Sequence, residues 1–282
     1  MEKLSSLAAL TDVVKGAKDL LNLHQLKILK PSREMLHLPR YSKLLDAFGN
    51  KTEGCDEGAD RLPNFLLSGR GSDLQKALWH WFVEFSIHQV LSAEFIDELV
   101  KLIHGGKRIL ELGAGNGVLT AHLKRKSPCE KITFLASDDY SSKIAVDDDV
   151  QVLRLEFGEA LNTLNPDIVV VSWMPPGVDF TKAIRSTQSV KKYILIGEVD
   201  SSTCGESWAT WGVPPTIGCK RCEFEGCPRC DFMGIVDQTE KPWGQDWVRS
   251  TEKEASRYSF CRFDLTCGGG GNSEVVQMVR QK

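Results

Sequence analysis

The sequence lacks any hydrophobic run long enough to cross a bilayer, which takes about 20 consecutive apolar residues. It also lacks a strong excess of charge: 35 Lys and Arg oppose 38 Asp and Glu, giving a pI of about 6.1. No globally basic field therefore indicates nucleic acid or an anionic membrane as the partner. The N-terminus has no charged-then-apolar secretion signal, and Glu2, Asp12 and Asp19 are atypical of a mitochondrial presequence. We expect a soluble protein of the cytoplasm or nucleus.

Cysteine is plentiful, but its distribution does not suit a secreted disulfide framework. The nine cysteines are odd in number, and four of them form a C-x2-C-x4-C-x2-C pattern at Cys219, Cys222, Cys227 and Cys230. Two such pairs supply four thiolates, as tetrahedral zinc requires, so we predict a structural zinc site. The spacer between the pairs is shorter than in common zinc ribbons. Disulfides, free surface thiols and an iron–sulfur cluster are the alternatives.

The composition suits a globular chain with a proper core, at 41% hydrophobic and 26% charged residues. Residues 1–65 are predicted to form a helical N-terminal extension and connector. Residues 66–282 form the main domain, in which 201–249 is an irregular, cysteine-rich insert with several tryptophans. Basic residues next to the cysteines make this insert a candidate contact for RNA or an acidic partner.

The most informative segment follows the aliphatic run that ends at Leu112. There Glu111, Gly113, Gly115 and Gly117 make an E-x-G-x-G-x-G pattern before helix-compatible sequence. A strand, a tight turn and a helix with free N–H groups facing a ligand would have this sequence. The dinucleotide fingerprint G-x-G-x-x-G needs its third glycine where Val118 stands, so a nicotinamide or flavin site is disfavoured. A glycine turn that binds nothing is the other alternative.

This pattern resembles the first motif of the class I S-adenosylmethionine-dependent methyltransferases. Strands and helices then alternate, and two strand-like runs, Tyr258 to Leu265 and Glu274 to Val279, end the chain. We predict an α/β fold with a Rossmann-like, doubly wound, mostly parallel seven-stranded sheet and an antiparallel C-terminal hairpin. The methyltransferase family has that topology, and the resemblance covers about Ser72 to Lys282.

The resemblance implies a set of residues that bind S-adenosylmethionine. Glu111 would hold the methionine end, often through a water, and Asp138 (or Asp139) would bind the ribose hydroxyls. Glu159 would receive the adenine amino group and Arg70 would pair with the carboxylate. The full expected set is Arg70, Glu111, Gly113, Gly115, Asn116, Gly117, Asp138, Asp139, Glu159, Ser172 and Trp173. A solvated turn at the Asp doublet, an exposed Glu159 on a helix start, a core Trp173 and a surface Arg70 are the plainer interpretations.

The methyl acceptor should lie beside the ends of the fourth and fifth strands. The candidates for holding it or taking its proton are Asp179, Glu198 and Asp200, with Tyr140 across the cleft. Asp179 is also a candidate helix cap. We expect methyl transfer to an unidentified N, O or S acceptor, which is a small molecule, a protein or an RNA. Recognition of RNA or protein through the cysteine-rich insert and a catalytically silent, cofactor-binding adaptor are the alternatives.

Overall fold

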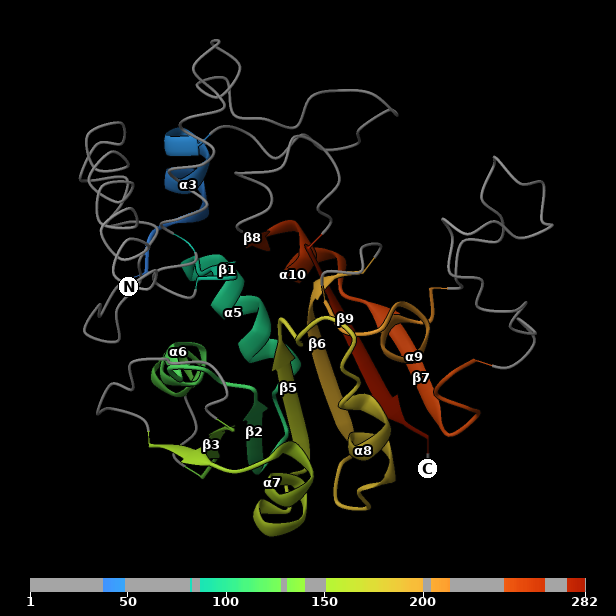
Figure 1. Cartoon of the computed structure of the whole chain (residues 1–282). Helices are drawn as coiled ribbons and strands as arrows, with labels where there is room; N and C mark the ends of the chain where they lie inside the picture. The colour runs from blue at the N-terminus through green and yellow to red at the C-terminus, as the bar shows by residue number, and fades with distance from the viewer. Residues whose placement is uncertain are drawn as a thin grey trace, which may run out of the picture.

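The computed structural model describes residues 38–48, 82, 87–127, 131–139, 151–199, 204–213, 241–261 and 273–281. Its centre is a seven-stranded sheet in the order β4-β3-β2-β5-β6-β9-β7 (Figure 1). The strands are β2 (Arg108–Leu112), β3 (Thr133–Asp138), β4 (Val152–Arg154), β5 (Ile168–Ser172), β6 (Lys192–Glu198), β7 (Trp247–Thr251) and β9 (Ser273–Arg280). Strands β2 to β6 are parallel, and β9 runs antiparallel between β6 and β7. The predicted doubly wound sheet with antiparallel strands at one edge is confirmed.

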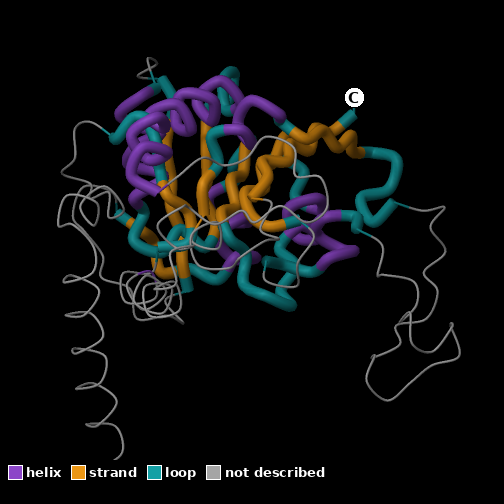
Figure 2. Tube along the Cα trace, turned by 90° about the horizontal axis from the view of Figure 1, so that it is seen from above, coloured by secondary structure: helices purple, strands orange, loops and turns teal. Residues whose placement is uncertain are grey.

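Helices cover both faces of this sheet (Figure 2). One face carries α5 (Ala93–Leu102), α6 (Val118–Lys126) and α10 (Lys253–Arg257), and the other carries α7 (Phe157–Leu164), α8 (Thr181–Ser186) and α9 (Ser207–Trp211). Successive strand residues point to opposite faces, so Ile109 packs with the first group and Leu110 with the second. Both are buried, which explains why a central parallel strand such as β5 is a continuous aliphatic run from Ile168 to Val171 instead of alternating with polar residues.

Side-chain oxygens bond the first turns of two helices, from Ser92, the N-cap of α5, and from Asp179, which precedes the N-cap Phe180 of α8. The hydroxyl of Ser92 accepts a hydrogen bond from Phe95 N at 3.2 Å at the start of α5. The carboxylate of Asp179 accepts one from Thr181 N at 3.0 Å at the start of α8. Within the parts of the chain that the structure describes, no helix is long and apolar enough to span a membrane.

The partner of the last strand differs from the prediction. Strand β9 pairs with β6 on one side and, on the other, with β7, which lies at the end of the predicted insert. Phe260–Cys261 is instead a short strand, β8, that pairs with β1 (Gln89–Val90) in a separate two-stranded sheet. Alternating apolar residues identify a strand but do not choose its neighbour, which long-range packing decides.

Two further boundaries are corrected. The sequence pattern predicts a strand from Val150 to Phe157, but β4 has only the residues Val152–Arg154 and α7 begins at Phe157. The Glu156 side chain accepts a hydrogen bond from Gly158 N at 2.9 Å and thereby caps that helix. The insert is also not irregular throughout, since α9 and the start of β7 lie within it.

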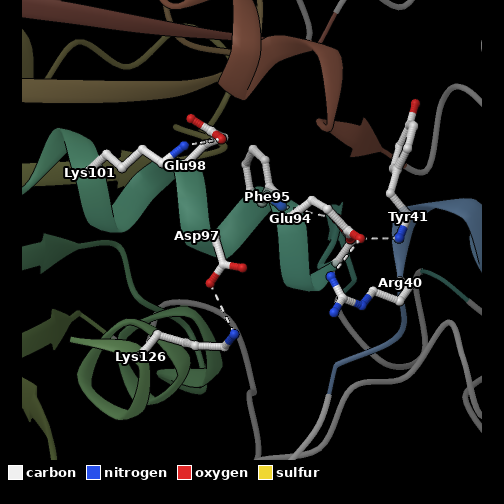
Figure 3. Close-up of polar contacts among 9 residues, drawn as sticks. Arg40, Tyr41, Glu94, Phe95, Asp97, Glu98, Lys101 and Lys126 are labelled. Carbon is white, nitrogen blue, oxygen red and sulfur yellow. Dashed lines mark hydrogen bonds and ion pairs between the residues drawn. The ribbon is translucent and has the colours of Figure 1, made fainter. Parts of the chain in front are cut away.

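Helix α3 (Tyr41–Phe48), in the predicted connector, is held to the N-terminal turn of α5 (Figure 3). The carboxylate of Glu94 accepts hydrogen bonds from Tyr41 N at 2.7 Å and from Arg40 Nη1 at 3.3 Å. The Tyr41 ring also packs edge-on against Tyr258, with 5.3 Å between centroids. Glu94 thus caps α3 from a different helix, since α3 has no acid in its own first turn.

Candidate functional site

The site predicted from sequence lies where the direction of the strand order reverses. The chain passes from β2 outward to β3 and β4, then crosses to β5 on the other side of β2. Strands β2 and β5 are neighbours, with Leu112 opposite Val171. In an open parallel sheet, ligands bind in the crevice outside the carboxyl ends of the strands at this switch point. The glycine segment continues β2 there, and Trp173 directly follows β5.

All three glycines of the motif adopt a backbone conformation that disfavours side chains. Their φ angles are 65° at Gly113, 56° at Gly115 and 72° at Gly117, all in the left-handed region. Gly117 N also donates to Ala114 O at 2.8 Å, which closes the turn before α6. Gly113 is exposed, and a Cβ built on it would meet only Phe180 Cε2, at 3.6 Å. At Gly113 the loop therefore leaves its backbone open to approach, whereas Gly115 is half-buried and Gly117 is buried.

Glu111 is buried within β2 and holds the first turn of α6. Its Oε2 accepts a hydrogen bond from Thr120 N at 3.0 Å and a shorter one from the Thr120 hydroxyl. Gly117, at the N-cap position of α6, has no side chain for capping, so Glu111 supplies the missing acceptor. An acid inside an apolar strand thus has a structural use that its position in sequence did not reveal.

The first acid of the Asp doublet at the end of β3 contacts the glycine loop. Asp138 is half-buried, and its Oδ2 accepts a hydrogen bond from Gly115 N at 2.9 Å. Asp139 is exposed. Asn116 belongs to the same loop, where its Oδ1 accepts a hydrogen bond from Val118 N at 3.2 Å. The structure therefore brings the loop together with Asp138, the residue we placed first in the doublet.

Glu159 is exposed on the first turn of α7, so its position agrees with the plainer interpretation of a helix-start acid. An aromatic pair that the sequence did not single out lies nearby. The rings of Phe157 and Phe180 stack at 4.8 Å and 26°, and Phe180 is the side chain facing Gly113. Phe157 begins α7 and Phe180 is the N-cap of α8, so no spacing signal in the sequence links them.

At the end of β5, Ser172 is half-buried and Trp173 is 8% exposed. Trp173 has a φ of 58°, one of two positive values outside glycine among the described residues. Its indole Nε1 donates to Gln89 Oε1 at 3.0 Å, and its ring lies against His88 with 6.0 Å between centroids. Both partners come from β1 and the residue before it, which sequence reasoning did not connect with the site.

The candidates on the acceptor side differ in what they hold. Asp179 Oδ1 accepts hydrogen bonds from Thr181 and, at 3.2 Å, from Thr210 Oγ1, which ties α8 to α9. Glu198 is buried at the end of β6, opposite Ser273 of β9. Two hollows on the described surface lie away from the glycine loop: one of about 300 Å³ between α7 and α8, and one of about 540 Å³ that Asp179 borders together with Trp208 and Trp243.

Some predicted site residues lie outside the described part of the chain: Arg70, Tyr140, Asp200, Cys219, Cys222, Cys227 and Cys230. Within the described part, no group of three or more His, Cys, Asp or Glu residues could hold a metal.

The sheet order, the glycine loop and the acid at the end of β3 define a Rossmann-like, doubly wound α/β domain. No protein-family model matches the chain, and no curated protein does. Three similar solved structures are a putative O-methyltransferase from Klebsiella pneumoniae, an O-methyltransferase family protein from Burkholderia thailandensis and human N-acetylserotonin methyltransferase in complex with SAM.

The identities of these three are 15%, 10% and 8%, and their TM-scores are 0.39, 0.36 and 0.36. The matches cover 78%, 76% and 86% of this chain. This chain spans 96% of the Klebsiella protein, 61% of the Burkholderia protein and 63% of the human enzyme.

Proposed function

We propose that this protein is an S-adenosylmethionine-dependent methyltransferase that acts on an N, O or S acceptor. The observation that carries the proposal is the contact between Gly115 N and the Asp138 carboxylate, 2.9 Å apart, at the switch point of the sheet. This contact joins the glycine loop to an acid. The two oxygens of its carboxylate can together accept several hydrogen bonds, as binding of the two ribose hydroxyls requires. A nicotinamide dinucleotide is the rival ligand, and Val118 in place of the third glycine argues against it.

S-adenosylmethionine, when bound, supplies an activated methyl group, so the protein mainly has to position the acceptor against it. Gly113, Gly115 and Asp138 would hold the nucleoside, and Trp173 would border the side toward the acceptor. Of the three acids proposed to hold the acceptor or take its proton, Asp179 already bonds Thr181 and Thr210. Glu198 is buried at the end of β6, and all three acids stay candidates for this role.

Recognition of an RNA or protein acceptor through the cysteine-rich insert is the finer form of this proposal. Lys220, Arg221 and Arg229 surround the four cysteines and make the segment locally basic in a chain of net charge −3. A zinc ion held by the four thiolates would supply rigidity to such a short segment. The proposed location of the protein is the cytoplasm or the nucleus.

Ligand-dependent stabilisation tests the central proposal. S-adenosylmethionine or S-adenosylhomocysteine at about 100 times its Kd should raise the unfolding free energy by about 2.7 kcal/mol, and NAD should not. The measurement is the melting temperature with each ligand. A shift with NAD alone, or none with either sulfur ligand at millimolar concentration, would reject the proposal.

A catalytically silent adaptor is the second candidate. It is favoured by the structural use of two acids, since Glu111 holds α6 and Asp179 joins α8 to α9. Turnover separates the two functions. An enzyme would transfer a labelled methyl group from S-adenosylmethionine to some fraction of a cell extract, whereas an adaptor would bind the ligand and label nothing.

A further inference from the structure

The turn after β5 is held in a strained conformation by residues from distant parts of the chain. Trp173 has a φ of 58°, which costs free energy for a residue with a Cβ and persists only where the surroundings impose it. Its backbone N donates to Ile196 O at 2.8 Å, continuing the pairing of β5 with β6. This backbone contact anchors the main chain, so the direction of the indole depends on its side-chain partners.

Those partners form a small polar network. Gln89 Oε1 accepts hydrogen bonds from Trp173 Nε1 at 3.0 Å and from Ser273 Oγ at 3.2 Å, and Gln89 Nε2 donates to Ser259 Oγ at 3.0 Å. The hydroxyls of Ser259 and Ser273 are 2.6 Å apart, and both serines are buried. A buried network whose members are all bonded fixes one arrangement of its side chains. The stacked ring of His88 covers the indole from the same segment.

The network also lies beside the proposed acceptor position. Ser273 begins β9 directly opposite Glu198 of β6, and Trp173 follows β5, the neighbour of β2. Residues from β1, β9 and the turn before β8 therefore meet at the end of β5. An aromatic side chain placed there by a hydrogen bond is suited to border a ligand, because a buried indole N–H needs an acceptor and takes its direction from it.

From this juxtaposition we infer that Gln89 is a positioning residue of the site. It holds the Trp173 indole in the orientation that receives the cofactor at the switch point. Ser259 and Ser273 set the direction of the Gln89 amide. The inference rests on the proposed function, because it assigns Gln89 a role in that same site.

The test uses the full-length protein and S-adenosylhomocysteine as the probe. Gln89→Met should weaken S-adenosylhomocysteine binding roughly 2- to 10-fold, as expected for one lost hydrogen bond. Gln89→Glu keeps the acceptor for the indole and should restore most of the affinity. Gln277→Met is the matched control, because the Gln277 amide donates to Glu252 Oε1 at 3.1 Å, away from Trp173.

A double-mutant cycle and a spectroscopic signal separate positioning from a general structural effect. Gln89→Met in a Trp173→Phe background, which lacks the indole N–H, should change affinity by less than about twofold. In protein labelled with 5-fluorotryptophan, Gln89→Met should move the ¹⁹F resonance that Trp173→Phe removes, and the control should not. Purely additive effects, or an unmoved resonance, would overturn the inference while wild-type binding upholds the proposed function. If the wild-type protein does not bind the probe, the proposed function fails and this inference fails with it.

Discussion

The carboxylates of Glu111, Asp138 and Asp179 each accept a backbone N–H, but from different partners. Glu111 and Asp179 bond the first turns of α6 and α8, whereas Asp138 bonds the glycine loop itself. Helix caps of this kind contribute about 1 kcal/mol to stability and need no ligand. Asp138 is therefore the acid whose removal should affect cofactor binding most specifically.

Asp138→Ala should lower the affinity for S-adenosylmethionine roughly 10- to 100-fold, because charge-assisted hydrogen bonds contribute about 1.5–3 kcal/mol each. Asp139→Ala is the matched control: that side chain is exposed and adjacent in sequence. Isothermal titration calorimetry of both variants checks the assignment. The reverse result, with Asp139 the sensitive position, would show that the register at the end of β3 is wrong.

Cys204 makes stability depend on pH in the alkaline range. Burial raises the pKa of this thiol from 9.0 to about 12, so its folded pKa exceeds its unfolded one. Its contribution is therefore fully present below pH 9 and is lost as the pH rises from 9 toward 12. Between pH 8 and 10, wild-type unfolding free energy should fall by about 1 kcal/mol more than that of Cys204→Ala. Urea unfolding at both pH values tests this, and parallel losses in the two proteins would contradict it.

At the scale of elements, α6 depends on an acceptor from its neighbouring strand. Glu111→Leu should destabilise the protein by about 1–3 kcal/mol, because Thr120 N loses its partner at the buried start of α6. Glu111→Gln keeps an acceptor and should cost less, while Thr120→Val removes only the hydroxyl contact. Chemical denaturation measures all three. If Glu111→Gln is stable but no longer stabilised by S-adenosylmethionine, the carboxylate also serves the cofactor.

Helix α3 is attached to α5 through one side chain. Glu94→Ala should increase hydrogen exchange at the amide of Tyr41, which donates to that carboxylate at 2.7 Å. Glu98→Ala is the control. Glu98 lies one turn further along α5 than Glu94, and it pairs with Lys101, which is largely exposed (Figure 3). Equal exchange at Tyr41 in both variants would indicate that other contacts, such as Tyr41 against Tyr258, hold α3 in place.

At the scale of the whole molecule, the predicted zinc site of the cysteine-rich insert can be tested independently of the cofactor site. If the four cysteines of the insert bind zinc, the purified protein should contain roughly one zinc per chain and Cys222→Ser should lose it. Elemental analysis decides the point. Cys204→Ala, at a buried cysteine outside the predicted zinc-binding set, should keep the metal. Zinc-free wild-type protein would favour disulfides, free thiols or an iron–sulfur cluster.

Much of the parallel part of the fold could be predicted because its signals are local. Aliphatic runs such as Ile109 to Leu112 are buried on both faces, and Ser92 and Gly117 mark the starts of α5 and α6. The antiparallel edge was predicted less well. Strand β9 finds its partner in β7 across a helix and a second small sheet, and no local pattern encodes that choice.

The glycine loop and the acids at its edge follow from the amino-acid sequence alone, because a left-handed backbone favours glycine and each strand end is marked by a change of composition. Only the tertiary structure decided which acids hold helices and which one holds the loop. It also brought Gln89 and Trp173 together and placed Phe180 beside Gly113. These contacts join residues far apart in the chain, and packing of the complete sheet is what brings such residues within hydrogen-bonding distance.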